Sequence, residues 1–274
     1  MAEPMLQITG LRHTFNPGTP AEMRALQGID LALERGAFLV VLGTNGSGKS
    51  TLLNAVAGSF LVNQGSIRLA GQDITRWPEH RRATLIGRVF QNPFSGTAPT
   101  MTVAENLALA AHRTRQGGLG RALGRLRRRE IAAQVERLGT GLEDRLDAPI
   151  GLLSGGQRQA LTLLMATYER PQLLLLDEHT AALDPKSAEQ VLRLTQDIVG
   201  RLRLTTLMVT HSLPQAVRLG DRALMMHRGR IVHEWSGIRK RRLRVDDLLT
   251  TFDEVRSAEL LDASAAGMLE RNYV

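Results

Sequence analysis

With 274 residues, of which 43% are hydrophobic, the chain is long enough for one large α/β domain that carries a subdomain. It contains no cysteine, which excludes disulfides, cysteine-ligated iron–sulfur clusters and thiol catalysis and is typical of a reducing compartment. No apolar run approaches the roughly 18 residues of a membrane span and no signal-peptide pattern opens the chain, so we expect a cytosolic protein, with a formal net charge of +8.

Residues 1–75 are predicted to contain short strands joined by turns. The segments LQITGLRHTF, GIDLALERG and GSIRLAGQDI carry strand-like runs separated by turn-rich sequence. They predict an antiparallel β patch beside a main sheet.

Three continuous apolar runs predict the main sheet. They are FLVVL at Phe38–Leu42, QLLLLD at Gln172–Asp177 and TTLMVT at Thr205–Thr210. Strands that are buried on both faces of a parallel sheet have this unbroken apolar pattern. Helical patterns fall between the runs, notably at Lys186–Gly200. We therefore expect a parallel sheet covered by helices on both faces.

Two further regions have a helical pattern. Residues 100–170 contain no strand-like run and predict an inserted helical subdomain. After Phe252 an acidic, helix-prone tail continues to Val274, and we assign it no role beyond packing.

The stretch GTNGSGKST matches the phosphate-binding P-loop pattern. It follows a predicted strand and opens a predicted helix, which is the context that the motif requires. Its backbone N–H groups are expected to surround phosphates, with Lys49 reaching the β- and γ-phosphates and Ser50 binding Mg²⁺. The nucleotide-binding residues predicted here are Gly43, Thr44, Asn45, Gly46, Ser47, Gly48, Lys49, Ser50 and Thr51.

Polar residues that follow neighbouring strands complete a predicted nucleotide site. Asp177 ends a strand and is expected to support Mg²⁺, while Glu178 is placed to act on a water that attacks the γ-phosphate. His211 ends the next strand, and Gln91 ends the strand-like IGRVFQ, where its amide can reach Mg²⁺ or the water. The alternatives are a solvated acidic loop and a structural histidine.

A second phosphate-binding pattern appears in LLSGGQRQA. Ser154, Gly155 and Gly156 stand at the head of a helical run, where small residues and the helix dipole favour an anion. A chain that already has a P-loop does not need this second site for the same phosphates.

Positive charge is concentrated in two stretches. His112–Glu130 holds seven arginines and Gly237–Arg244 holds five basic residues. A solvated surface, a membrane surface and nucleic acid are the three interpretations, and the lack of interleaved aromatic residues argues against base stacking.

The order of P-loop, glutamine, LSGGQ, LLLLDE and histidine resembles the ATP-binding subunits of ABC transporters, over Leu6 to Phe252. The resemblance implies an α/β fold with the parallel-sheet core of a P-loop NTPase (RecA-like), the antiparallel β patch and the helical subdomain at about 100–170. The nucleotide-binding domain is then residues 1–252, with a helical tail at 253–274.

The resemblance also implies how LSGGQ works. Two chains meet head to tail, and each LSGGQ caps the ATP that the partner's P-loop holds, with Mg²⁺ as the second cofactor. The residues that carry over are Ser154, Gly155, Gly156 and Gln157 for the cap, Asp184 for the dimer interface and Phe15 for stacking on adenine. His179 stands where most members have proline, and we expect no effect on chemistry.

The resemblance also implies partner proteins and a cellular location. A separate membrane permease is expected to contact Asn92–Asn106, with Met101 and Val103 as apolar contacts, and a periplasmic or lipoprotein binding protein would deliver the solute. The sequence looks most like the importer ATPases that pair with permeases of the branched-chain amino acid type, which implies a small solute such as an amino acid and a peripheral place at the cytoplasmic face of the inner membrane. An exporter ATPase and a soluble ATPase such as one for cluster assembly remain alternatives, and no nucleic acid partner is expected.

Overall fold

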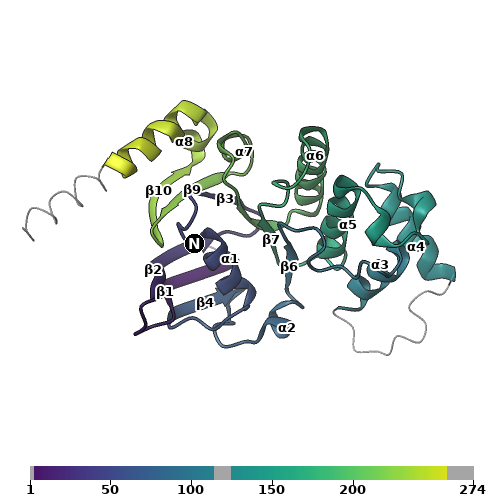
Figure 1. Cartoon of the computed structure of the whole chain (residues 1–274), viewed down its shortest axis with the longest axis horizontal. Coiled ribbons are helices and arrows are strands. Elements are labelled where there is room, and N and C mark those ends of the chain that lie inside the picture. Colours follow the sequence, from purple (N-terminus) through teal and green to yellow (C-terminus); the bar gives the residue numbers. More distant parts are fainter. Residues whose placement is uncertain (1–2, 114–124, 258–274) are drawn as a thin grey trace, which may run out of the picture.

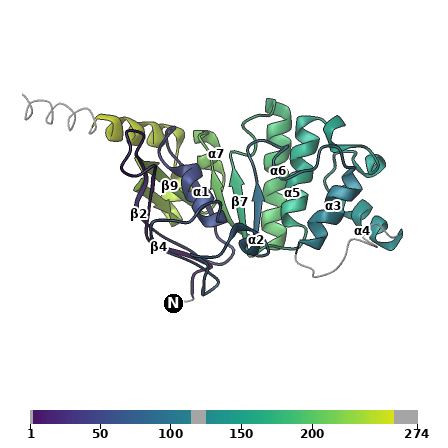
Figure 2. The same cartoon turned by 60° about the horizontal axis from the view of Figure 1, so that its bottom comes forward.

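The computed structural model describes residues 3–113 and 125–257 of the chain (Figure 1). Within these residues two sheets and a group of helices are arranged side by side, as Figures 1 and 2 show from two directions.

The smaller sheet is antiparallel and comes from the first part of the chain. Its order is β2-β1-β4-β5, with β1 at Leu6–Phe15, β2 at Met23–Leu33, β4 at Gln64–Leu69 and β5 at Gln72–Asp73. Buried and exposed residues alternate along much of β1, as they do when one face of a sheet covers a core. The predicted antiparallel patch is therefore confirmed.

The larger sheet has six strands in the order β10-β9-β3-β8-β7-β6. Neighbouring strands from β9 to β6 pair in parallel, and only the pairing of β10 with β9 is antiparallel. The strands are β3 (Phe38–Leu42), β6 (Ile86–Val89), β7 (Leu173–Asp177), β8 (Thr205–Val209), β9 (Arg222–His227) and β10 (Arg230–Ser236). The parallel core is as predicted, whereas the β9–β10 hairpin was not predicted.

Helices cover both faces of the larger sheet. Helix α1 (Lys49–Ala57) packs between the two sheets, where Leu52, Leu53 and Val56 join a buried cluster that includes residues of both. Helices α6 (Pro185–Leu202) and α7 (Leu213–Arg218) contribute to the cluster on the opposite face. The short α2 (Glu79–Arg82) follows the antiparallel sheet.

The helical subdomain is confirmed for the described part of residues 100–170. It contains α3 (Val103–His112), α4 (Arg125–Glu136), α5 (Gly155–Thr167) and two short 3-10 turns at Glu143–Arg145 and Ile150–Leu152, around their own apolar cluster. Figure 2 shows these helices grouped beyond the edge strand β6, on the side away from the antiparallel sheet. The central residues 114–124 of the first basic stretch lie outside the described residues.

The second basic stretch forms α8 (Gly237–Arg242), in which Lys240 is buried and donates to the carbonyl of Val217 at 2.8 Å. A helix then runs from 245 to 257, and Phe252 and Val255 pack against the core. The predicted boundary at 252 thus falls inside one helix, and 258–274 lie outside the described residues. In the part that the structure describes, no helix is long and apolar enough to cross a membrane.

Candidate functional site

The P-loop curls around its own lysine. Lys49 is the first residue of α1, and its Nζ donates to the carbonyl oxygens of Gly43 at 2.8 Å and Thr44 at 2.9 Å. Burial lowers the pKa of Lys49, while the nearby Glu178 and Asp177 raise it. The ammonium is therefore already desolvated and held within the loop before any phosphate arrives.

Glycines and one buried hydroxyl shape this loop. A Cβ on Gly43 would lie 2.3 Å from the carbonyl oxygen of Met226, and Gly48 has a positive φ of 97° in a position where a Cβ would meet the carbonyl of Ala25 at 2.5 Å. The Ser47 hydroxyl is buried without a hydrogen-bond partner among the residues described. Because buried polar groups are normally paired, this hydroxyl and the close-fitting loop fit a bound phosphate.

Ser50 and Asp177 meet beside the loop. The Ser50 hydroxyl lies 3.5 Å from Asp177 Oδ1, and Arg88 pairs with Asp177 Oδ2 at 3.4 Å. Burial raises the pKa of Asp177, the Arg88 guanidinium lowers it, and Glu178 raises it further. Within the described ranges no group of three or more His, Cys, Asp or Glu could hold a metal alone. Hydroxyl and carboxylate oxygens suit Mg²⁺, which takes its remaining ligands from phosphates and water.

Glu178 and His211 form a pair at the carboxyl ends of β7 and β8. His211 Nδ1 lies 3.1 Å from Glu178 Oε2, and the Glu178 N–H donates to the carbonyl of Val209 at 3.0 Å. The backbone of Glu178 has a positive φ of 43°, which is unusual for a residue with a side chain and turns the chain away from the strand.

A pocket of about 550 Å³ joins these groups. The structure therefore brings the P-loop, Gln91, Glu178 and His211 together, as the common strand edge predicted. The residues that line the pocket are Met23, Ala25, Asn45, Gly46, Ser47, Gly48, Lys49, Ser50, Thr51, Gln91, Glu178 and His211.

Met23 is a pocket residue that sequence reasoning missed. It pairs with Phe15 across β1 and β2, is 53% exposed and lines the pocket. The Phe15 ring packs edge-on against His13 and Phe60, with ring centres 4.5 and 5.4 Å apart. A methionine outside any motif carries no sequence signal for ligand contact, and stacking of Phe15 on adenine stays a prediction.

The LSGGQ segment lies outside this pocket. Ser154 caps α5: its hydroxyl accepts from the N–H of Gln157 at 3.2 Å, and the Gln157 side chain accepts from the N–H of Ser154 at 3.3 Å. Ser154 and Gly155 are exposed, whereas a Cβ on Gly156 would lie 2.9 Å from the Ser187 side chain of α6. The two phosphate-binding patterns therefore open at separate places on one chain.

Asp184 caps the neighbouring helix α6. Its carboxylate accepts from the N–H groups of Lys186 at 3.1 Å and Ser187 at 3.0 Å. Its chain neighbour Leu183 would lie 3.2 Å from a Cβ on Gly155, so the start of α6 lies beside the LSGGQ helix start.

Comparison with known proteins identifies the family. The model of the ABC transporter family matches residues 26–181, more than half of the chain. The chain belongs to the ABC transporter family. It is an ATP-binding subunit of this family, an ATPase whose hydrolysis is coupled to transport.

Relatives of this ABC transporter subunit carry several names. It is 41% identical to a tyrosine transport ATP-binding protein of Clostridioides difficile, over 91% of this chain and 99% of the relative. It is 36% identical to the lipoprotein-releasing system ATP-binding protein LolD 1 of Caulobacter vibrioides, over 83% of this chain and 94% of the relative. It is also 36% identical to the methionine import protein MetN of Rhizobium johnstonii, over 86% of this chain and 62% of the relative.

Solved ABC cassettes share its fold. The dimeric cassette MJ0796 bound to ADP and phosphate has a TM-score of 0.73 at 25% identity, covering 85% of this chain and 98% of that one. MJ1267 in its ADP conformation has a TM-score of 0.74 at 24% identity, over 91% of this chain and 96% of that one. The predicted family and the predicted P-loop NTPase fold are both confirmed.

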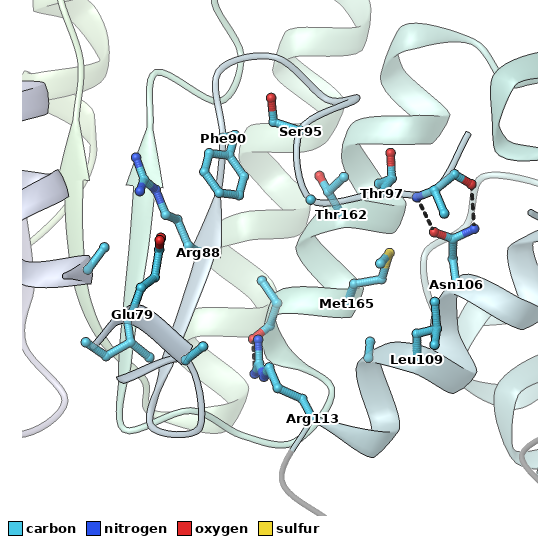
Figure 3. A pocket seen from close by; sticks show the side chains of 17 residues that line it. Glu79, Arg88, Phe90, Ser95, Thr97, Asn106, Leu109, Arg113, Thr162 and Met165 are labelled. Carbon is cyan, nitrogen blue, oxygen red and sulfur yellow. Dashed lines mark hydrogen bonds between the residues drawn. The ribbon is translucent and has the colours of Figure 1, made fainter. Parts of the chain in front are cut away.

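A second pocket, of about 540 Å³, separates the sheet core from the helical subdomain (Figure 3). Ser95 and Thr97 enter it from the segment after Gln91, and Leu109 and Met165 enter from α3 and α5. We call it the subdomain groove. Its full lining is Ala57, Glu79, Ala83, Ile86, Arg88, Phe90, Ser95, Gly96, Thr97, Ala98, Asn106, Leu109, Ala110, Arg113, Thr162, Met165 and Ala166.

One predicted permease contact is wrong. Val103 is fully buried in the apolar cluster of the subdomain, because the first turn of α3 faces inward. Asn106 is also buried, and its amide exchanges hydrogen bonds with the backbone of Ala98 at 2.8 and 3.0 Å. These two hydrogen bonds, which Figure 3 shows as dashed lines, connect the segment after Gln91 to α3. Met101 is half-buried, and its contact with the permease stays a prediction.

Proposed function

We propose that the chain binds Mg-ATP and hydrolyses it to drive import of a small solute, an amino acid or a related compound, through a separate membrane permease. The observation that carries the proposal is the pocket in which the P-loop, Gln91 and the Glu178–His211 pair meet. The relatives named for tyrosine transport and methionine import support an amino acid as the solute.

Each side chain has a proposed step. Lys49 and the loop N–H groups bind the β- and γ-phosphates, and Ser50, Asp177 and Gln91 hold the magnesium ion. Bound Mg²⁺ supplies charge neutralisation for the phosphates. Glu178 accepts a proton from the attacking water, a contribution typically worth about 10²–10⁴-fold in rate.

His211 has a positioning role in this scheme. At 3.1 Å from Glu178, its ring can hold the carboxylate toward the water, and as an imidazolium it can also donate from its other nitrogen to the γ-phosphate. Its side chain lines the pocket and is 57% exposed, so it is accessible to a bound phosphate, which supports this role.

Two copies of the chain complete the sites. Ser154, Gly155, Gly156 and Gln157 would cap the ATP held by the P-loop of the partner copy, with Asp184 at the interface. The exposure of Ser154 and Gly155 away from their own pocket supports this arrangement. A two-fold axis then makes two equivalent composite sites.

The subdomain groove is the proposed permease contact. The segment Asn92–Asn106 forms part of its wall, and Leu109 offers an exposed apolar side chain there. A binding protein would deliver the solute to the permease on the other side, and the chain would lie peripherally at the cytoplasmic face of the inner membrane. The similarity to LolD proteins of lipoprotein-releasing systems supports a second candidate function, the release of lipoproteins from that membrane.

The first experiment tests nucleotide binding with a fluorescent ATP analogue. Lys49→Ala should lose affinity and turnover, because it removes the buried charge that meets the phosphates. Lys240→Ala is the matched control: it also removes a buried ammonium bonded to a carbonyl, but Lys240 does not line the pocket. Normal hydrolysis by Lys49→Ala would contradict the proposal.

The second experiment tests direction and solute. Membrane vesicles that contain the subunit and its co-purified permease would be supplied with ATP on the subunit side. Accumulation of a labelled aromatic amino acid or methionine on that side would support import, and loss of lipoprotein from the membrane would favour release.

A further inference from the structure

Arg88 lines the subdomain groove and is linked through Asp177 to Ser50 of the nucleotide pocket. It lies in β6 opposite Leu175 of β7, and its side chain faces α1. Its guanidinium donates to Asp177 Oδ2 at 3.4 Å, to Asn54 Oδ1 at 2.5 Å and to Ser59 Oγ at 3.2 Å. Figure 3 shows the same residue on the wall of the subdomain groove, near Glu79 and Phe90.

The two carboxylate oxygens of Asp177 have different partners. Oδ2 is held by the guanidinium of Arg88, whereas Oδ1 is left on the side of Ser50, 3.5 Å from its hydroxyl. Both partners are largely buried, with 13% and 14% of their side chains exposed, so solvent screens the pair little. A carboxylate fixed in this way presents one chosen oxygen to the place where Mg²⁺ would sit.

The guanidinium is itself held from several sides. It stacks over the Phe90 ring, with 4.4 Å from its central carbon to the ring centre, and Ser59 in turn bonds to Glu79 at 3.1 Å. Arginine's planar fork can make these contacts together, which a lysine ammonium cannot reproduce.

We propose that Arg88 is a positioning residue for the metal site: it orients Asp177 so that Oδ1 faces the magnesium ion of the bound nucleotide. This rests on the proposed role of Asp177 in Mg²⁺ binding. Residues that orient metal ligands typically contribute about 10–100-fold in metal affinity or activity.

The test measures metal binding directly, with Mn²⁺ as a paramagnetic probe and a non-hydrolysable ATP analogue. Arg88→Met keeps the length and the packing on Phe90 but removes the charge and the donors. Arg88→Lys keeps the charge. Arg81→Met is the matched control, because Arg81 stacks on Trp77 at 3.6 Å with no contact to the site. Affinity for the nucleotide analogue in EDTA is measured for every variant.

We expect Arg88→Met to weaken Mn²⁺ binding about 10–100-fold, Arg88→Lys to weaken it less, and Arg81→Met to leave it unchanged. Analogue affinity in EDTA should stay within about twofold in all three, because Arg88 touches no phosphate-binding group. If Arg88→Met does not fold, Arg88→Lys decides alone: unchanged Mn²⁺ binding overturns the proposal.

Other outcomes also overturn it. Unchanged Mn²⁺ binding in Arg88→Met would leave Arg88 without a metal role. Tighter binding would mean that the guanidinium competes with the metal for Asp177. An equal loss of metal-free nucleotide affinity would mean that Arg88 only supports α1. If Lys49→Ala also binds nucleotide normally, the proposed function fails as well; if Lys49→Ala fails to bind, only the role of Arg88 is lost.

Discussion

The hydroxyl of Ser154 already accepts a hydrogen bond at the start of α5, and it keeps a proton that it can donate. A phosphate can therefore bind to it without breaking the helix cap. Loss of activity in an alanine variant would mix two effects, because alanine removes the cap as well as the donor.

Substitution by glycine separates these effects. Ser154→Ala should lower the free energy of unfolding by about 1 kcal/mol, whereas Ser154→Gly should cost only a few tenths. Both should lose ATPase activity, since neither has a hydroxyl to donate to the partner's phosphate. Denaturant unfolding and phosphate release measure the two quantities. An active Ser154→Gly enzyme would argue against the capping role in the dimer.

His179 gives the chain a built-in sensitivity to acid. It is fully buried beside Glu178, its Nε2 lies 3.0 Å from the Thr195 hydroxyl, and burial lowers its pKa to about 4. The unfolded chain, with an ordinary histidine pKa near 6.5, takes up a proton first as the pH falls. Stability from this residue is therefore present above about pH 6.5 and lost progressively toward pH 4.

We expect His179→Leu to flatten that pH dependence. The shift from 6.5 to about 4 corresponds to a loss of about 3 kcal/mol at most. Urea unfolding of the metal-free chain at several pH values between 4 and 7 measures the difference. Parallel curves for wild type and His179→Leu would show that another group titrates.

At the scale of elements, the sequence predicted strands that have either an unbroken apolar run or a clear alternation of apolar and polar residues. FLVVL is β3 without a shift, and LQITGLRHTF is β1. The β10 strand RIVHEWS was missed because it is an edge strand with mostly exposed residues, and such a strand has neither an apolar run nor a clear alternation.

Side-chain direction was harder to predict than the elements themselves. In VAENLALAAH of α3, apolar residues occur on several sides of the helix, so the pattern does not distinguish Val103, which is buried, from Leu109, which is 40% exposed. Likewise the start of β2, where Met23 lies, gave no sign that it reaches the nucleotide pocket. The motif residues were predictable because each follows a strand whose end lies at one common edge.

This difference in direction gives a paired prediction for α3. Val103→Asp places an unpaired charge in the apolar cluster and should lower the free energy of unfolding by about 4 kcal/mol. Leu109→Asp, at the subdomain groove, should leave stability and basal ATPase near normal but weaken permease binding. Denaturant unfolding and co-purification with the permease measure the two effects. A Leu109→Asp variant that still holds its permease would place the contact elsewhere.

At the scale of the whole molecule, the separation of the P-loop pocket from LSGGQ can be tested by mixing defective chains. Glu178→Gln removes the proposed base, and Ser154→Arg blocks the proposed cap. A dimer with one chain of each, isolated with two affinity tags, contains one undamaged composite site and one site with both lesions. We expect hydrolysis to recover toward half of the wild-type rate.

The reciprocal dimer is the control. When both substitutions are in one chain and the partner is wild type, each composite site is damaged once, so phosphate release should be lost. Self-contained sites would give the reverse pattern, with an active control and an inactive mixed dimer. That result would contradict the two-chain site.

The distance between the LSGGQ helix start and its own nucleotide pocket also has a genetic consequence. With the proposed two-chain site, a chain with a damaged cap would disable the ATP site of the partner that it joins. When a cell makes equal amounts of normal and damaged chains, dimers with both sites intact become the minority. An allele that damages the cap would then be dominant, and its effect would grow with the amount of damaged chain that the cell makes.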